Sequence, residues 1–353
     1  MSGGAPDIAV VGGGIVGCAL AAFLAEGGAS VTLFEREAIA AGASGRNSGV
    51  VQHPLDAALV GLYEESLSHY AGLGRGFELP ADPAGLLLVA EPERLGPAPA
   101  GFPELRPTRL EGAELRAAEP ALADGLAAWR LETGRPVPPA AAANAFAARA
   151  REAGARIELG AEAHVAPGGV IVGGERRPAG AVALAAGPWT PAAYGGGDLP
   201  VQAQWGVVVE FELPGAPTHV MEEAGIEALT SAGGAPPALF SAVTARGISA
   251  IGSTFTAERP DAGAVAPVIV EHATRFLPAL RGASRRGLRA CARPRSHDGR
   301  PFLGWLDEPA RVAVASGHGA WGITLGPASA RLVADLLLGR RPEIPAEFAP
   351  GRG

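Results

Sequence analysis

Residues 8–35 read IAVVGGGIVGCALAAFLAEGGASVTLFE, and this stretch decides the fold. The apolar run at 8–11 predicts a short strand, the segment after the glycines has the apolar spacing of a helix, and residues 30–34 predict a second strand. A glycine pair at 27 and 28 stops the helix. The stretch therefore predicts the opening of a Rossmann-like domain: strand, glycine turn, helix, strand.

The glycines and the acid at the end of this unit predict a dinucleotide site. Gly12 makes the tight turn, Gly14 lets the backbone approach a pyrophosphate, and Gly17 allows close helix packing. The phosphates are expected at the helix N-terminus. Glu35, 23 residues after Gly12, is placed to accept hydrogen bonds from the adenosine ribose hydroxyls.

Two later segments favour a flavin over a nicotinamide. Residues 41–49, AGASGRNSG, form a glycine and serine loop where a nicotinamide enzyme would usually continue into a crossover helix. Near the other end, a strand at 311–316 leads into GHGAWG at 317–322 and then into an amphipathic helix. The positive N-terminus of that helix suits an anionic flavin pyrimidine.

On these residues the sequence resembles the D-amino-acid oxidase superfamily of FAD-dependent oxidoreductases, which includes glycine oxidase, sarcosine oxidase and D-amino-acid dehydrogenases. The matching segments are IAVVGGGIVGCALAAFLAEGGASVTLFERE, GASGRNSG at 42–49, ALAAGPWT at 183–190, and the GHG stretch near the end of the chain. The resemblance implies a bound FAD in contact with Gly12, Gly14, Ile15, Val16, Gly17, Glu35, Arg36, Ser44, Arg46, Asn47, Ser48, Gly49, Val165, Ala186, Gly187, Trp189, Cys291, Gly319, Gly322, Ile323 and Thr324.

Arg293 is the residue that the resemblance assigns to the substrate. In the glycine oxidase branch an Arg-Pro, three variable residues and an Asp-Gly precede the last strand, and residues 293–299 have this spacing. The resemblance implies that Arg293 anchors the substrate carboxylate, which is sensible because a guanidinium is an always-charged, bidentate clamp. A structural ion pair is the alternative.

Cys291 corresponds to the cysteine that links FAD covalently in the sarcosine oxidase branch. That branch has an aromatic residue in place of Arg293 and a lysine near the flavin, whereas this chain contains no lysine. We therefore predict non-covalent FAD, with a bond to Cys291 as the alternative. The missing lysine also leaves the electron acceptor open, so that oxygen and another acceptor are both compatible with the sequence.

Two further residues are candidates for the active cavity. His318 is the best placed histidine if the reaction uses a base, although the family's hydride transfer from the α-carbon to flavin N5 needs no dedicated one. Trp205 lies on a predicted strand and either points into the cavity or packs in the core. We expect no metal site.

The order of the predicted elements indicates two interleaved domains. After a long excursion, a helix within 138–154 and strands at 156–159 and 181–186 return to the Rossmann pattern, while 200–213 and 239–255 alternate with period two. We predict an α/β protein with a Rossmann-like FAD-binding domain (1–79, 139–199 and 286–353) and an antiparallel-sheet substrate domain (80–138 and 200–285). Residues 214–237 show no clear pattern and are a candidate lid.

Composition limits the class of partner and the compartment. The formal charge of −7 argues against nucleic acid, although 275–300 holds eight arginines and one acid. The two cysteines, Cys18 and Cys291, cannot make a disulfide framework and favour a reducing compartment. Because the sequence also shows no signal peptide and no long apolar run, we expect a cytoplasmic protein without a transmembrane segment. The sequence does not indicate an oligomeric state.

These features predict an enzyme that oxidises a small amino acid or secondary amine, such as glycine, sarcosine, proline or a D-amino acid, at the carbon next to nitrogen. The imine product would then hydrolyse in water. A 2-hydroxy-acid dehydrogenase is the alternative within the same fold, because GRNSGVV at 45–51 also resembles that branch. A non-catalytic flavoprotein subunit of a larger complex is an alternative of another class.

Overall fold

The N-terminal unit folds as the sequence predicts. The computed structural model describes residues 7–225, 238–340 and 343–352, and it begins with β1 (Asp7–Val11), α1 (Ile15–Glu26) and β2 (Ser30–Glu35). β1 and β2 pair in parallel, with α1 as the crossover between them. This confirms the βαβ unit with which the Rossmann-like fold opens.

Six strands form the sheet that positions this unit. They are β1, β2, β8 (Arg156–Leu159), β12 (Ala181–Leu184), β18 (Phe302–Asp307) and β19 (Val312–Ser316), in the order β18-β19-β12-β1-β2-β8. All pairs are parallel except β18 with β19. The strand order reverses between β1 and β12, and ligands of such sheets bind at the carboxyl ends of the strands at this switch point.

Helices cover one face of this sheet, and a small second sheet covers the other. On one face α1, α5 (Ala141–Glu152) and α9 (Gly322–Leu337) share a core with Ile8 and Val10, and α3 (Ala57–Tyr70) packs beside α9. On the opposite face the core of Ala9 and Val11 includes residues from α6 (Thr190–Tyr194) and from the antiparallel sheet of β9 (Ala163–Ala166), β10 (Gly169–Val172) and β11 (Glu175–Pro178). The three-stranded sheet was not predicted.

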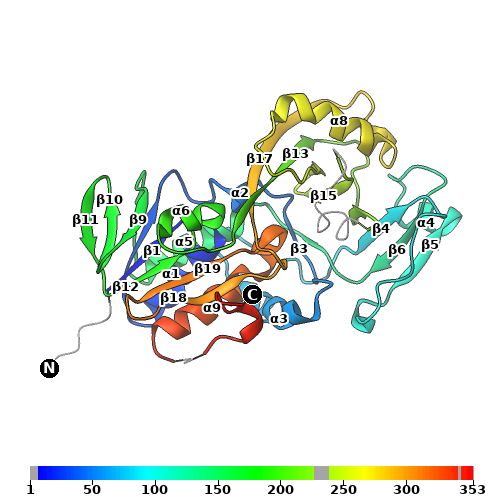
Figure 1. The fold of residues 1–353 in the computed structure, drawn as a ribbon. Coiled ribbons are helices and arrows are strands. Elements are labelled where there is room, and N and C mark those ends of the chain that lie inside the picture. Colours follow the sequence, from blue (N-terminus) through cyan, green and yellow to red (C-terminus); the bar gives the residue numbers. More distant parts are fainter. Residues whose placement is uncertain (1–6, 226–237, 341–342, 353) are drawn as a thin grey trace.

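An eight-stranded sheet lies beside the six-stranded one (Figure 1). Its order is β17-β13-β16-β15-β14-β4-β6-β5, made by β4 (Leu86–Ala90), β5 (Thr108–Glu111), β6 (Ala127–Leu131), β13 (Gln202–Phe211), β14 (Val220–Glu223), β15 (Ser241–Ala245), β16 (Ile248–Gly252) and β17 (Arg285–Arg295). Its pairs are antiparallel except β14 with β4. This agrees with the predicted antiparallel sheet.

Alternation along β13 decides which side of this sheet faces the rest of the molecule. Val207 and Val209 point into a core shared with α8 (Ala262–Thr274), which covers that face of the sheet (Figure 1). Because neighbouring strand residues point to opposite faces, Gly206 and Val208 lie on the face away from α8. That second face is the one that can present side chains to a cofactor bound on the six-stranded sheet.

Short elements complete the fold. They are α2 (Ala43–Arg46), the paired strands β3 (Val50–Val51) and β7 (Arg135–Pro136), α4 (Gly112–Ala118), and 3₁₀ turns at Pro103–Leu105, Gly187–Trp189, Pro278–Leu280, Gly319–Trp321 and Ala346–Phe348.

The structure places two segments differently from the sequence-based expectation. β17 pairs with β13 along its whole length, so residues 286–295 belong to the larger sheet and not to the sheet of β1. Within the candidate lid at 214–237, β14 lies in the interior of the larger sheet, between β15 and β4. The lid prediction is therefore wrong for 220–223, and residues 226–237 lie outside the described residues. The division into two domains stays a prediction.

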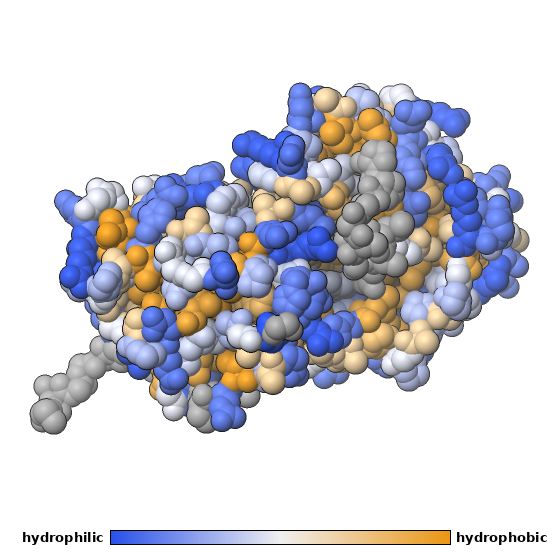
Figure 2. Space-filling model, in the orientation of Figure 1, coloured by the Kyte–Doolittle hydropathy of each residue, from blue (hydrophilic) through white to orange (hydrophobic). Residues whose placement is uncertain are grey.

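Hydrophobic side chains are scattered over the face drawn in Figure 2. Hydrophobic patches there are separated by hydrophilic surface, and one of them lies over α8. Among the described residues, Leu159, Ile171 and Val268 are the large hydrophobic side chains that remain exposed. No helix in the described part of the chain is both long and apolar enough to cross a membrane.

Candidate active site

A long cavity begins at the carboxyl ends of β1 and β12 and continues to β17 and the start of α9. Separated pieces of the chain line it: residues 11–16, 34–37, 41–44 and 47, then 161–164, 185–189, 192 and 193, and finally 291, 293, 294, 315, 316, 318–320, 322 and 323. This brings together seventeen of the residues predicted from sequence: Gly12, Gly14, Ile15, Val16, Glu35, Arg36, Ser44, Asn47, Ala186, Gly187, Trp189, Cys291, Arg293, His318, Gly319, Gly322 and Ile323.

The glycine turn after β1 is shaped for close backbone approach. Gly12 has φ +112°, and a Cβ atom there would overlap the carbonyl oxygen of Ala185 at the end of β12. A Cβ atom on Gly17 would overlap the carbonyl oxygen of Gly12, so this glycine lets α1 sit against the turn instead of lining the cavity. α1 begins after Gly14 without a side-chain cap. The N–H of Ile15 donates to Ser44, and the other N–H groups of the first turn can bind an anion such as a pyrophosphate.

Glu35 fixes the acidic side of the cavity. Its carboxylate accepts hydrogen bonds from the N–H groups of Gly13 (2.6 Å) and Glu37 (2.8 Å), which hold it at the end of β2 beside the glycine turn. An ionised carboxylate has about four acceptor positions, so two remain for ligand hydroxyls. A neighbouring cation–π contact places the Cζ of Arg36 3.8 Å from the ring centroid of Trp189, and both residues line the cavity.

The glycine and serine loop is tied directly to the start of α1. The hydroxyl of Ser44 accepts a hydrogen bond from the N–H of Ile15 (2.9 Å). The Asn47 amide donates to the carbonyl oxygens of Ala43 and Ser44, and its own oxygen accepts from the N–H of Gly49. These bonds give the loop a single shape against the cavity.

The N-terminus of α9 closes the other end of the cavity, and Pro327 explains how it is supported. Proline has no N–H, so the helix cannot donate to the carbonyl oxygen of Ile323 at the usual spacing. The Tyr70 hydroxyl from α3 donates to that oxygen instead (2.5 Å), and the N–H of Ala328 donates to the hydroxyl of Ser66 (3.1 Å). α3 thereby anchors the turn that presents Gly322 and Ile323 to the cavity.

Arg293 is a charged group in the cavity lining that has no carboxylate partner among the described residues. Its guanidinium donates to the carbonyl oxygen of Thr254 (3.0 Å) and to the hydroxyl of Ser253 (2.8 Å), and its Cζ lies 4.4 Å from the ring centroid of Phe255. Burial lowers the pKa of the guanidinium, which stays charged at neutral pH. A half-buried guanidinium whose partners are neutral can bind an anion.

His318 is the titratable group nearest to the start of α9. Its side chain is 2% exposed, and within the described ranges its Nε2 atom has no hydrogen-bond partner. Burial lowers the pKa of the imidazole to about 4, so the ring is neutral at physiological pH. Nε2 is itself buried, so the structure does not expose this unpaired nitrogen to the interior of the cavity.

The register of β13 and β17 separates Trp205 from these groups. Arg293 pairs with Gln204 and Cys291 with Gly206, so both face the cavity, whereas Trp205 pairs with Ala292. Trp205 therefore points to the other side of the sheet, where Arg259 lies over its ring. The structure does not bring Trp205 to the cavity.

Six predicted cofactor contacts also lie outside the cavity lining. Gly17 packs against Gly12, Gly49 against the carbonyl oxygen of Val137, and Arg46 donates to the carbonyl oxygen of Ala290. The Thr324 hydroxyl accepts from the N–H of Gln52. Ser48 and Val165 do not line the cavity either. Glu162 and His164, which are near Val165 in the sequence, do line it.

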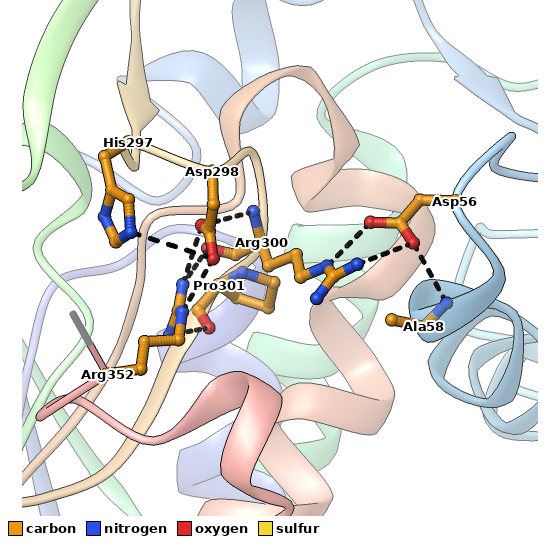
Figure 3. Close-up of polar contacts among 7 residues, drawn as sticks. All are labelled: Asp56, Ala58, His297, Asp298, Arg300, Pro301 and Arg352. Atoms are coloured by element: carbon orange, nitrogen blue, oxygen red, sulfur yellow. Dashed lines mark hydrogen bonds and ion pairs between the residues drawn. The ribbon is translucent and has the colours of Figure 1, made fainter.

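The connection between β17 and β18 is held by two arginine–carboxylate pairs (Figure 3). Arg352 binds both oxygens of Asp298 (2.8 and 3.0 Å) and the carbonyl oxygen of Pro301. Arg300 binds both oxygens of Asp56, which also accepts from the N–H of Ala58 and so caps α3. The network joins the segment after Arg293 to the helix that supports α9.

Sequence reasoning missed two parts of the lining. Residues 161–164 lie at the start of β9, and Ala192 and Ala193 lie on α6. Neither segment carries a sequence motif. Their role follows from the small sheet packing against the six-stranded one, which local sequence does not indicate.

Comparison with known proteins gives this geometry a family context. The family model described as DAO, FAD dependent oxidoreductase, matches residues 7–336. A segment of 83 residues is 35% identical to the glycine oxidase of Bacillus subtilis (strain 168), which is 24% of this chain and 22% of that protein. The sequence match to this curated relative thus spans less than a quarter of its length.

The structural similarity extends over almost the whole chain. The glycine oxidase of Geobacillus kaustophilus superposes with a TM-score of 0.82 at 26% identity, covering 99% of both chains. The glycine oxidase of Bacillus cereus ATCC 14579 gives 0.79 at 25% identity, covering 95% of this chain and 96% of that one. The iminodiacetate oxidase of Chelativorans sp. BNC1 shares the fold, with a TM-score of 0.80 at 23% identity and coverage of 97% and 98%.

Proposed function

The chain belongs to the DAO family of FAD-dependent oxidoreductases, and we propose that it oxidises a small amino acid or secondary amine at the carbon next to nitrogen. The observation that carries this proposal is Arg293, a half-buried guanidinium in the cavity lining without a carboxylate partner among the described residues. Such a group favours a substrate that brings its own carboxylate.

The residues of the cavity fit FAD. The uncapped start of α1 suits the pyrophosphate, Glu35 has acceptor positions for ribose hydroxyls, and the uncapped start of α9 suits the electron-rich edge of an isoalloxazine. When bound, FAD would supply the acceptor for the hydride that leaves the carbon next to nitrogen. The amine thereby becomes an imine, which water hydrolyses to a carbonyl compound and an amine or ammonia.

The chain's own residues orient the substrate in this proposal. Arg293 holds the carboxylate by paired N–H donors, which fixes the α-carbon relative to the flavin. His318 lines the same cavity and is uncharged at neutral pH. We propose that it does not remove a proton from the substrate, because a group with a pKa of about 4 is a weak base at neutral pH.

The similarity to the two glycine oxidases supports a small amino acid as the substrate. We propose non-covalent FAD, and either oxygen or another acceptor for its reoxidation. Nucleic acid is not proposed as a partner, since the formal charge is −7.

Anaerobic flavin bleaching tests the proposal. Glycine, sarcosine, proline and D-amino acids are mixed with the oxidised holoenzyme, loss of the visible flavin band is followed, and air is then admitted. We expect at least one of these amines to bleach the flavin. Bleaching by lactate and by none of the amines would instead support 2-hydroxy-acid oxidation, and no bleaching by either class would support a non-catalytic subunit.

The role of Arg293 is tested with Arg293→Met. Loss of a paired charge contact of this kind is worth about 2–4 kcal/mol, so KM for the best amino acid should rise roughly 30-fold or more. The control is Arg285→Met, an exposed arginine at the start of the same strand. An unchanged KM in Arg293→Met would contradict the anchor.

A further inference from the structure

Gly206 lies on β13 directly beneath the guanidinium of Arg293. A Cβ atom built on Gly206 would lie 2.5 Å from Cζ of Arg293 and closer still to both terminal nitrogens. Real Cβ atoms do not approach other heavy atoms so closely, so the guanidinium fills the space that any other side chain would need.

The backbone does not require glycine at this position. Gly206 lies within a regular strand, opposite Cys291, and it is not among the glycines with positive φ. Glycine inside a strand costs stability and often marks a place where another group approaches the backbone. Here the approaching group is the charged end of Arg293.

The surrounding contacts show how the guanidinium is oriented. Both terminal nitrogens would lie nearer to that Cβ atom than Cζ does, so the end of the guanidinium that carries them rests against Gly206 on β13. Its two terminal nitrogens are each held by one hydrogen bond, to the Thr254 carbonyl and the Ser253 hydroxyl. A guanidinium has five N–H donors in one plane, so three remain for other partners.

We propose that Gly206 is a positioning residue that determines carboxylate specificity. Its missing side chain lets the terminal end of the guanidinium rest against β13, and this position fixes the direction in which the free N–H groups point toward the substrate. A bidentate bond needs the carboxylate and the guanidinium in one plane, and this arrangement sets that plane. The inference rests on the proposed role of Arg293 as the carboxylate anchor.

Gly206→Ala is the direct test, made on the FAD-loaded enzyme. The added methyl group must lift the guanidinium off the strand, and a displacement of about 1 Å can cost about 10- to 100-fold. We expect KM for the best amino acid of the panel to rise by this factor with a smaller change in kcat, and the affinity for acetate, followed by the flavin spectrum, to fall by a similar factor. The Kd for FAD should not change.

Gly61→Ala is the matched control. Gly61 is an exposed glycine on α3, and a Cβ atom there would meet nothing within 4 Å. This substitution should leave KM, acetate affinity and the Kd for FAD unchanged. A KM and acetate affinity of wild-type size in folded Gly206→Ala would overturn the proposal.

A double-mutant cycle separates this inference from the role of Arg293. In an Arg293→Met background, Gly206→Ala should lower kcat/KM no further, because the group that it displaces is gone. An equal loss in both backgrounds would overturn the proposal and leave the anchor intact. A wild-type KM in Arg293→Met alone would overturn the anchor itself.

Ser253→Ala provides a second variant should Gly206→Ala fail to fold. It removes one of the two hydrogen bonds that hold the guanidinium plane, and we expect about a 5-fold rise in KM that disappears in the Arg293→Met background. An unchanged KM in Ser253→Ala would contradict a fixed plane.

Discussion

His318 links the cavity wall to the acid stability of the protein. Burial lowers the pKa of its imidazole to about 4, whereas an unfolded histidine titrates near 6.5. Between these values the unfolded chain binds a proton that the native state does not, so stability falls as pH drops below about 6.5. Above this range the group has no effect.

The pH effect predicts a specific difference for His318→Asn. Between pH 7 and pH 5 the wild-type free energy of unfolding should fall by about 2 kcal/mol more than that of the variant. Urea denaturation of the holoenzyme at both pH values measures it. Parallel losses in the two proteins would show that the imidazole is not held neutral in the native state.

Cys291 faces the cavity two residues before Arg293, yet it is expected to remain a free thiol. It is buried, and a buried free cysteine is usually inert. Acid precipitation should leave the yellow colour in the supernatant, and Cys291→Ala should behave in the same way. Colour that stays in the wild-type pellet and moves to the supernatant in the variant would establish the covalent bond.

At the scale of elements, the start of α9 depends on a hydroxyl from α3. Tyr70→Phe should lower the free energy of unfolding by about 1–3 kcal/mol, because the carbonyl oxygen of Ile323 loses its donor and Pro327 cannot replace it. Urea denaturation is the measurement, with Tyr194→Phe on α6 as the control.

Pro327→Ala supplies the matching rescue. It restores an N–H four residues after Ile323, so the cost of Tyr70→Phe should shrink in that background. If the cost is the same with proline and with alanine at 327, the hydroxyl does not act through the carbonyl oxygen of Ile323.

Some elements could be predicted from sequence because their signals are local. The glycines of 12–17 require a turn, and Asp56 caps α3 with its own carboxylate. α8 and the β9–β11 sheet were missed because Pro267 interrupts the helical pattern of the first, and the strands of the second are four residues long. Both α8 and the β9–β11 sheet form because they pack against the larger sheets.

At the scale of the whole molecule, the network of Figure 3 joins three distant segments. Burial opposes ionisation of Asp298, but hydrogen bonds from Arg352 and from the N–H of Arg300 outweigh it and lower the pKa to about 2. A carboxyl with a lowered native pKa contributes its stability above the unfolded value near 3.9 and loses it as pH falls toward 2.

Asp298→Asn should therefore destabilise the protein at pH 7 by about 1 kcal/mol, a small value because the pair is partly open to solvent. The difference from wild type should shrink below pH 4, as thermal unfolding at several pH values would show. Asp124→Asn, which breaks an exposed pair with Arg116, serves as the control and should have little effect. A difference that is constant down to pH 2 would contradict the ionised pair.

The site shows where sequence reasoning reaches its limit. A motif pointed to Arg293 and a predicted strand to Trp205, but only the register of β13 with β17 puts one on the cavity side and the other on the opposite side. Gly206 gave no signal at all, because its role depends on a side chain from the neighbouring strand. Such cross-strand relations arise from the tertiary fold and leave no local pattern.

The central claim is that the substrate carboxylate binds Arg293 beside the flavin. The most direct measurement compares kcat/KM for the best amino acid of the panel with that for its amide, in the wild type and in Arg293→Met. We predict that the wild type prefers the acid and that this preference disappears in the variant, while oxidation of the amide changes little. An equal preference for the acid in both proteins would contradict the claim.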